Sequence, residues 1–539
     1  MQTRKQYEAA RLYSRDPHLH GSARWADRAH LQARHYGEQG RIFLGYGLPE
    51  HKKARSFAIT SSTQRHLLTI APTRSGKLLT ASAPRCMEHR GSLVVLDAKD
   101  GELALITARY RRDVLGHKVI IIDPWDKVCS YLGFTPARFN VMDWLDPDGD
   151  DFVEDTMLIA DSSVSDRGIK EPFWNDEAKA MIMGLTQYVA ATPLVLLPTE
   201  QKSRDLTQVR RLLNLSGRDF KAMVEGRFEE DEDGNAKLVQ PGMAQSRNEH
   251  VRAAAGRIMN KAAKELSGII STAQQNTHFL ESPRIQHSLS ASDFSYDELE
   301  NGETDIYIVL PAGRVHLYHR FLRMLIGTAL TAVTRFNRKP NPPVYFLIEE
   351  AVTALGKMEI IETAFGLMAG YGLQLHLIVQ DLNQLAIYEQ SWQTFIANSG
   401  VIQVFGTNDL TGIDYISRLC GIGTFESLSE ESASRRAALL SDPNFLSRDD
   451  GVNARSLITP DEVRTMHPAT QLLILPYAHP VACFKTAYFL DARYRDESGK
   501  PLFDIHPHYA HKKLPPPVNF LRPGLDIGGI LEPVFMEGA

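Results

Sequence analysis

Residues 73–77, with the sequence TRSGK, could form a turn that binds phosphate. They follow the apolar run HLLTIAP and precede a stretch, residues 77–88, that is compatible with a helix. In such a strand–turn–helix unit, backbone N–H groups face an anion and the lysine ammonium reaches the β- and γ-phosphates. The motif predicts ATP binding by Thr73, Arg74, Ser75, Gly76, Lys77, Leu78 and Leu79.

Two positions depart from the usual pattern G-x-x-x-x-G-K-[ST]. Ala71 replaces the first glycine, and Leu78 replaces the residue whose hydroxyl would ligate Mg²⁺. Thr80 carries a hydroxyl two residues later, on another side of the expected helix. On the motif alone, an ordinary glycine–lysine turn is therefore an alternative.

Two adjacent carboxylates follow a second apolar run. The run PVYFLI leads directly into Glu349 and Glu350. In ATPases with a phosphate-binding loop, the first acid holds Mg²⁺ through its water shell and the second polarises the attacking water. We predict these roles for Glu349, as metal ligand, and Glu350, as catalytic carboxylate, although the first acid is normally aspartate. A solvated acidic turn is the alternative, and the phosphate-binding motif weighs against it.

Gln380 ends a third apolar run, LHLIV. Neighbouring parallel strands end at one crevice, where ligands bind. We therefore predict that Gln380 senses the γ-phosphate. A polar cap at the end of the strand is the alternative.

The elements that position these residues indicate an α/β fold with a mostly parallel sheet. Short runs rich in Val, Ile and Leu are typical of strands buried on both faces. They occupy residues 66–72, 92–100, 118–125, 304–311, 343–350, 373–381, 400–409 and 470–477. Between them, residues 150–295 show helical periodicity and predict an inserted all-α domain. Its acidic stretch, residues 225–235, is predicted to be a solvated loop away from any DNA path.

Composition excludes several classes of protein. The net charge of -5 argues against a general polyanion binder, and four widely spaced cysteines indicate neither a disulfide framework nor a zinc site. The chain has no secretory signal and no apolar run of 18 residues; the run LRMLIGTALTAV is predicted to be a buried helix. Residues 1–60 form a basic segment, and residues 491–539 a proline-rich tail that we expect to be extended.

Many ordered segments resemble the type IV secretion coupling proteins, the conjugative DNA-transfer ATPases of bacteria. The resemblance covers about residues 20–490 and includes HGSARWADR, APTRSGK, GSLVVLDAKDGE, GHKVIIIDP, FNVMDW, PFWNDEAKAMIMGL, ALGKMEIIETAFGLMAGYGLQLHLIVQDLNQL and NSGVIQVFGTND. It implies a RecA-like ATPase core, residues 61–149 and 296–490, around the helical insertion. It also implies hexameric rings at the cytoplasmic face of the inner membrane, which pass DNA–relaxase complexes or effector proteins to a secretion channel.

This resemblance leaves two departures. Glu349 stands where the family has aspartate, and family members usually begin with transmembrane helices, which this chain lacks. Either the chain was cut, or it is a soluble variant that docks on membrane partners.

Three functions follow as hypotheses. The leading one is an ATPase that couples substrates to the channel with ATP and Mg²⁺. The others are a non-hydrolysing adaptor of the same fold, which Leu78 and Glu349 motivate, and a free DNA translocase. In a ring, a neighbouring subunit would supply an arginine to the site. We choose Arg418 for that role, with a surface ion pair inside its own subunit as the alternative.

Overall fold

The computed structural model describes residues 21–37, 40–49, 55–164, 172–230, 236–426, 452–507 and 514–537. Its centre is an 11-stranded sheet with the strand order β2-β1-β15-β14-β11-β3-β10-β9-β4-β8-β5. From β11 to β5 all neighbouring strands are parallel, whereas β14, β15, β1 and β2 extend the sheet with antiparallel pairs. The predicted α/β fold with a mostly parallel sheet is therefore confirmed.

All eight predicted strands are present, and three further strands join them. The sheet consists of β1 (Ile42–Gly47), β2 (Ala58–Ser61), β3 (His66–Ile70), β4 (Leu93–Asp97), β5 (Lys118–Ile122), β8 (Thr304–Val309), β9 (Val344–Ile348), β10 (Leu373–Val379), β11 (Ser399–Val404), β14 (Thr470–Ile474) and β15 (Val481–Phe484). The strands that the sequence did not predict, β1, β2 and β15, are short or contain glycine and lie at the antiparallel end.

Strand β4 shows how the sheet separates two hydrophobic cores. Leu93 and Val95 pack in one buried cluster, and Val94 and Leu96 pack in the other. Successive side chains of a strand point to opposite faces, so a strand that is covered by helices on both sides must be apolar at every position. This explains the continuous apolar runs of the sequence.

Helices cover both faces of the sheet. Those that frame the core are α2 (Arg28–Ala33), α3 (Ala83–Glu88), α4 (Glu102–Asp113), α5 (Cys129–Leu132), α13 (Val315–Thr334), α14 (Ala351–Leu355), α15 (Glu359–Leu367), α16 (Trp392–Ala397), α17 (Leu410–Cys420), α19 (Pro460–Arg464) and α20 (Ile527–Glu537). The predicted helix after the TRSGK turn begins with a π-helical turn, Leu78–Ser82, before α3. Helix α13 contains the run LRMLIGTALTAV, which is buried as predicted.

A buried ion pair fastens α3 and α4 behind the sheet. The Arg111 guanidinium on α4 donates to the Asp305 carboxylate on β8 at 2.7 and 2.5 Å, and both side chains are fully buried. The same guanidinium donates to the backbone oxygen of Cys86, on α3, at 2.9 Å. Since α3 continues from the TRSGK turn, this pair fixes the element that carries the predicted phosphate site.

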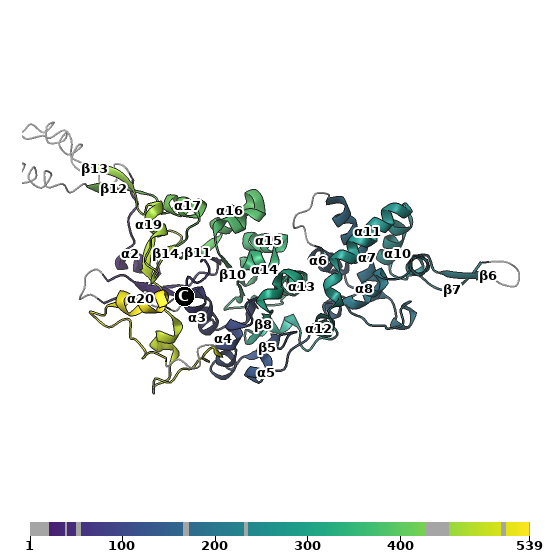
Figure 1. Ribbon diagram of the computed structural model, residues 1–539, viewed down its shortest axis with the longest axis horizontal. Helices are drawn as coiled ribbons and strands as arrows, with labels where there is room; N and C mark the ends of the chain where they lie inside the picture. Colours follow the sequence, from purple (N-terminus) through teal and green to yellow (C-terminus); the bar gives the residue numbers. More distant parts are fainter. Residues whose placement is uncertain are drawn as a thin grey trace, which may run out of the picture.

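The segment between β5 and β8 is mostly helical, with one exception. It contains α6 (Phe152–Ser163), α7 (Pro172–Ala191), α8 (Leu206–Leu213), α9 (Gly217–Glu225), α10 (Glu249–Met259), α11 (Ala263–Asn276) and α12 (Pro283–Ser288). Figure 1 shows most of these helices to the right of the sheet. The exception is the hairpin β6 (Arg227–Glu230) and β7 (Ala236–Gln240), at the far right, which the acidic stretch enters. Its strands are largely exposed; residues 231–235 lie outside the described residues.

Described parts of both terminal segments belong to the fold. Within the basic segment 1–60, β1 and β2 belong to the sheet; residues 1–20 lie outside the described residues. The prediction of an extended tail is wrong for its last part, because Ile527–Glu537 forms α20. Ile527, Leu531 and Phe535, spaced by four residues, place one apolar stripe of this helix in a buried cluster with Phe43 and Tyr46 of β1.

Disulfides and helices that could cross a membrane are both absent from the described residues. All four cysteines are buried and free, so none forms a disulfide. Among the described helices, none combines the length and the hydropathy that crossing a membrane requires.

Candidate active site

The three predicted chemical motifs meet at one edge of the sheet. Strands β3, β10 and β9 are parallel neighbours, so their carboxyl ends lie together. Lys77 follows β3, Gln380 follows β10 directly, and Glu349 and Glu350 follow β9 directly. The crevice expected at the ends of parallel strands is therefore formed by these residues.

Glu350 is the centre of this crevice. Its Oε1 accepts the Lys77 ammonium at 2.5 Å and the Lys99 ammonium at 2.7 Å. Its Oε2 accepts the Gln380 side-chain amide at 2.7 Å. The backbone of Glu350 is left-handed, with φ 52°, which is uncommon for a residue with a side chain and is found at functional sites.

These contacts control the charges of the crevice. Burial raises the pKa of the Glu350 carboxyl, but the bonds from Lys77 and Lys99 outweigh this effect and hold its pKa at about 2. Burial lowers the pKa of Lys77, although Glu350 opposes the change. For Lys99 the contacts with Glu350 outweigh burial, and its pKa is raised. Glu350 is therefore a carboxylate at every ordinary pH.

Glu349 has a different environment, although it is the next residue. It is 2% exposed, and its Oε1 accepts a hydrogen bond from the Ser82 hydroxyl. Burial raises its pKa, which the Ser82 bond and the two lysines only partly offset. A neighbouring buried acid, Asp97 at the end of β4, caps α4 by accepting the N–H groups of Leu103 and Ala104 at 2.8 and 3.0 Å.

The TRSGK turn has the backbone that a phosphate loop needs. Arg74 and Gly76 have positive φ angles of 61° and 84°. Among the described residues, none accepts the backbone N–H of Gly76 or of Lys77. Buried or half-buried N–H groups are normally paired, so these two are available to an anion.

A cleft of about 470 Å³ opens beside the turn. This volume lies in the range of small-ligand sites. Its lining is polar and includes Thr73, Arg74, Ser75, Gln380, Asp409, Arg464, Lys485 and Phe535. Lys485 donates to the Ser75 backbone oxygen at 2.7 Å and lies between the rings of Phe405 and Phe535, at 4.2 and 4.6 Å from their centroids. Burial lowers the pKa of Lys485 to about 7.

Helix α20 closes one side of this cleft. A Cβ on Gly76 would lie 2.6 Å from the Phe535 ring, so the helix contacts the turn itself. Figure 1 shows α20 beside α3, although the two are more than 400 residues apart in the sequence.

Comparison with known families decides what kind of protein holds this site. The model of the family described as type IV secretory system conjugative DNA transfer matches residues 24–508. The chain belongs to this family. The predicted family resemblance is thereby confirmed.

Curated members of the conjugative DNA-transfer family are similar over most of this chain. The conjugal transfer protein TraG of Agrobacterium fabrum is 27% identical over 427 residues, which are 79% of this chain and 60% of TraG. The type IV secretion system-coupling protein VirD4 of Bartonella quintana is 24% identical over 434 residues, 79% of this chain and 63% of VirD4. The chain thus spans about 60% of the length of these relatives.

Solved structures share the fold of this family member. The bacterial conjugative coupling protein TrwBdeltaN70, unbound, has a TM-score of 0.59 at 13% identity, with 86% of this chain and 92% of that chain covered. TrwB in complex with the non-hydrolysable ATP analogue ADPNP also has a TM-score of 0.59 at 13% identity, covering 86% and 93%. The likeness confirms the RecA-like fold.

In this family member, most of the predicted site residues fall into three groups. Lys77, Glu350 and Gln380 contact one another, and Glu349 lies next to them. Thr73, Arg74 and Ser75 line the cleft. Leu78 and Leu79 do not face it: both are partly buried against the apolar cluster around Cys86. The position of the missing hydroxyl is therefore used for packing.

Arg418 lies apart from this group. It is exposed on α17, eight residues after Leu410, or about 12 Å along a helix. No ion pair joins it to another residue within the described ranges, so the alternative of an ion pair inside its own subunit gains no support there.

Sequence reasoning missed three residues of the site. Lys99 follows β4, which neighbours β9, and a lysine two residues after a buried strand was a usable signal. Ser82 supplies a hydroxyl to Glu349 five residues after Lys77, which the π-helical turn allows. Lys485 had no recognisable signal, because it follows an unpredicted strand.

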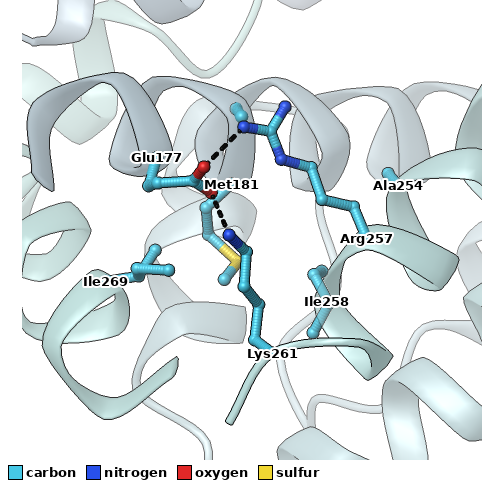
Figure 2. A pocket seen from close by; sticks show the side chains of 8 residues that line it. Glu177, Met181, Ala254, Arg257, Ile258, Lys261 and Ile269 are labelled. Carbon is cyan, nitrogen blue, oxygen red and sulfur yellow. Dashed lines mark hydrogen bonds and ion pairs between the residues drawn. The ribbon is translucent and has the colours of Figure 1, made fainter. Parts of the chain in front are cut away.

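A second hollow lies in the helical insertion and is too small for a ligand. Its volume of about 20 Å³ suits about one water molecule. Figure 2 shows Glu177 between Arg257 and Lys261, with ion pairs of 2.8 and 3.1 Å. This network joins α7 to α10 and to the turn between α10 and α11, so its role is structural.

Proposed function

We propose that this chain is an ATPase that couples substrates to a bacterial type IV secretion channel. The observation that carries the proposal is the meeting of Lys77, Glu350 and Gln380 at the carboxyl edge of the sheet. A cation, an acid and an amide at this edge, beside a turn with available N–H groups, suit the transfer of a phosphoryl group to water. Membership of the conjugative DNA-transfer family supports the substrate class.

The residues of the chain fit a nucleoside triphosphate. The N–H groups of residues 73–79 and the Lys77 ammonium would bind its phosphates, and Gln380 would contact the terminal one. The cleft lined by Arg74, Lys485 and Phe535 has room for the rest of the nucleotide. Glu350 would accept a proton from the attacking water, which contributes about 10²–10⁴-fold to a rate.

The chain also fits Mg²⁺, with a limited donor set. The described residues contain no cluster of three or more His, Cys, Asp or Glu that could hold a metal by itself. Magnesium in such sites is held by one or two carboxylates, by waters and by the phosphates of the nucleotide, and it neutralises charge that develops on them. Glu349, oriented by the Ser82 hydroxyl, would be the carboxylate that acts through the water shell.

The remaining parts of the proposal concern partners. The substrates would be DNA–relaxase complexes or secreted effector proteins, and the partners the channel components and single- or double-stranded DNA. The working form would be a homo-hexamer at the cytoplasmic face of the inner membrane, with Arg418 reaching the site of a neighbour. The likeness to TraG and VirD4 supports these assignments.

Phosphate release from ATP tests the proposal. The unchanged chain should release phosphate in the presence of Mg²⁺, faster with single-stranded DNA. Lys77→Ala should abolish both ATP binding and release, whereas Glu350→Gln should bind a fluorescent ATP analogue and release almost no phosphate. Equal rates for the unchanged chain and Glu350→Gln would refute the assignment.

The non-hydrolysing adaptor is the second candidate. The observation in its favour is the contact between Lys77 and Glu350. This contact occupies the lysine that would bind the phosphates and also the carboxylate that would activate water. This candidate predicts ATP binding without phosphate release, with or without DNA, and so the same assay separates the two.

A further inference from the structure

One oxygen atom of the site is contacted by two ammonium groups. Glu350 Oε1 lies 2.5 Å from Lys77 Nζ and 2.7 Å from Lys99 Nζ. Lysine forms short charge-assisted bonds with an anionic oxygen, whether of a carboxylate or of a phosphate. The arrangement therefore requires an anionic oxygen at this point but not specifically a carboxylate.

Lys99 is positioned to serve a ligand that enters from solvent. Its side chain is 31% exposed, whereas that of Lys77 is 6% exposed. It stands between β4 and α4, at the same edge of the sheet as the TRSGK turn. The next residue, Asp100, is tied to Lys127 at 2.8 Å, so the loop is anchored while the Lys99 amine can follow a new partner.

We propose that Lys99 is a second phosphate-binding cation, and that Glu350 Oε1 here occupies the place of an oxygen of the terminal phosphate. The inference rests on the proposed nucleotide site and adds a residue to it. When the terminal phosphate binds, both ammonium groups bond to it in place of Glu350. The carboxylate is then free to contact water.

This exchange accounts for an otherwise unfavourable feature of the site. Here three donors occupy the two oxygens of Glu350, with both lysines on Oε1 and Gln380 on Oε2. A general base needs an oxygen within hydrogen-bond reach of the water it activates. Transfer of both lysines to the phosphate frees Oε1 for that contact.

The test compares a triphosphate with a diphosphate by calorimetry, without relying on turnover. Lys99→Met should weaken binding of the non-hydrolysable analogue ADPNP about 10- to 100-fold, the effect of one lost hydrogen bond to a charged group. Binding of ADP should change less than about threefold, because ADP lacks the terminal phosphate. Lys264→Met, which removes an exposed lysine of α11 in the helical insertion, is the control and should change neither affinity.

A double-mutant cycle with Glu350→Gln tests the exchange itself. Removing the competing charge should tighten ADPNP binding in the unchanged background. In the Lys99→Met background this gain should be smaller, since only Lys77 is left to be released. Lys99→Arg should restore part of the ADPNP affinity, and thermal unfolding of each variant checks that it is folded.

Each outcome decides a separate point. Equal loss of ADPNP and ADP affinity in Lys99→Met, or no loss, would overturn the role of Lys99 while leaving the nucleotide site intact. Failure of the unchanged chain to bind either nucleotide would overturn the proposed function and this inference together.

Discussion

Lys485 gives the site a charge that depends on pH near neutrality. Its pKa is lowered to about 7 because burial opposes the ammonium form, and it lies against the Ser75 backbone oxygen of the TRSGK turn. Below pH 7 the side chain is a cation and attracts phosphate; above pH 7 it is neutral and does not. An anion bound beside it stabilises the ammonium and raises the pKa again.

Nucleotide affinity should therefore weaken as the pH rises from about 7 to 9. The last ionisation of a terminal phosphate lies near pH 6, and the negative charge it adds as the pH rises would strengthen binding, so a weakening reports the protein. Lys485→Arg, which stays charged, should remove most of the dependence. Calorimetry at pH 8 in buffers of different ionisation enthalpy should detect proton uptake on binding to the unchanged chain; identical profiles for both chains would contradict the assignment.

At the scale of elements, the contact between α20 and the TRSGK turn constrains a single glycine. Gly76 has a positive φ and touches the Phe535 ring, so Gly76→Ala introduces both backbone strain and a collision. We expect a loss of about 1–2 kcal/mol from the backbone alone, seen as a lower thermal unfolding midpoint. Adding Phe535→Ala should relieve the collision and recover part of the nucleotide affinity that Gly76→Ala loses; no recovery would mean that α20 does not limit the turn.

A second prediction at this scale concerns the contribution of the Arg111–Asp305 ion pair to the free energy of unfolding. Arg111→Met would leave the Asp305 carboxylate buried, without the guanidinium and with the His117 ring nitrogen at 3.3 Å. Removing one partner of a buried pair costs about 3–5 kcal/mol. Chemical denaturation should show this loss. The double variant Arg111→Met/Asp305→Leu should be more stable than Arg111→Met, and the reverse order would contradict the role of the pair.

The sequence predicted the elements whose residues carry a local signal. The eight strands with continuous Val, Ile and Leu runs were found because burial on both faces demands such runs. The sequence did not predict strand β1, which has two glycines in IFLGYG, or helix α20, which lies in a proline-rich tail. Their apolar residues pack against one another in the folded chain, and this long-range contact leaves no local signal in the sequence. The same limit applies to the site. Glu350 and Gln380 end predicted strands and Lys77 lies in a motif that follows one, whereas Lys485 depends on a strand at the unpredicted end of the sheet.

For the whole molecule, the exposed position of Arg418 predicts catalysis between subunits. Arg418→Ala keeps an intact phosphate loop, and Lys77→Ala keeps an intact arginine, so each alone should be nearly inactive. Mixed, the two variants should recover phosphate release, because some interfaces then combine both intact parts. Specific activity of the unchanged chain should also rise with protein concentration, as DNA or ATP promotes assembly.

The control for this experiment is Arg218→Ala, an exposed arginine of the helical insertion. It should leave the rate unchanged and should not complement Lys77→Ala beyond its own activity. A mixture of the Arg418 and Lys77 variants that is no more active than the sum of its parts would refute the role of Arg418.

The strand order also determines when the sheet can form during synthesis. Strand β3 lies between β10 and β11, yet about 300 residues separate it from β10 along the chain, and translation at about 5–20 residues per second takes roughly 15–60 seconds to cover that distance. The interval between synthesis of β1 and synthesis of its partner β15 is longer still. During this interval the apolar edges of β3 are uncovered on the ribosome. Slower growth and lower temperature during expression should therefore affect the yield of folded protein more than its final stability.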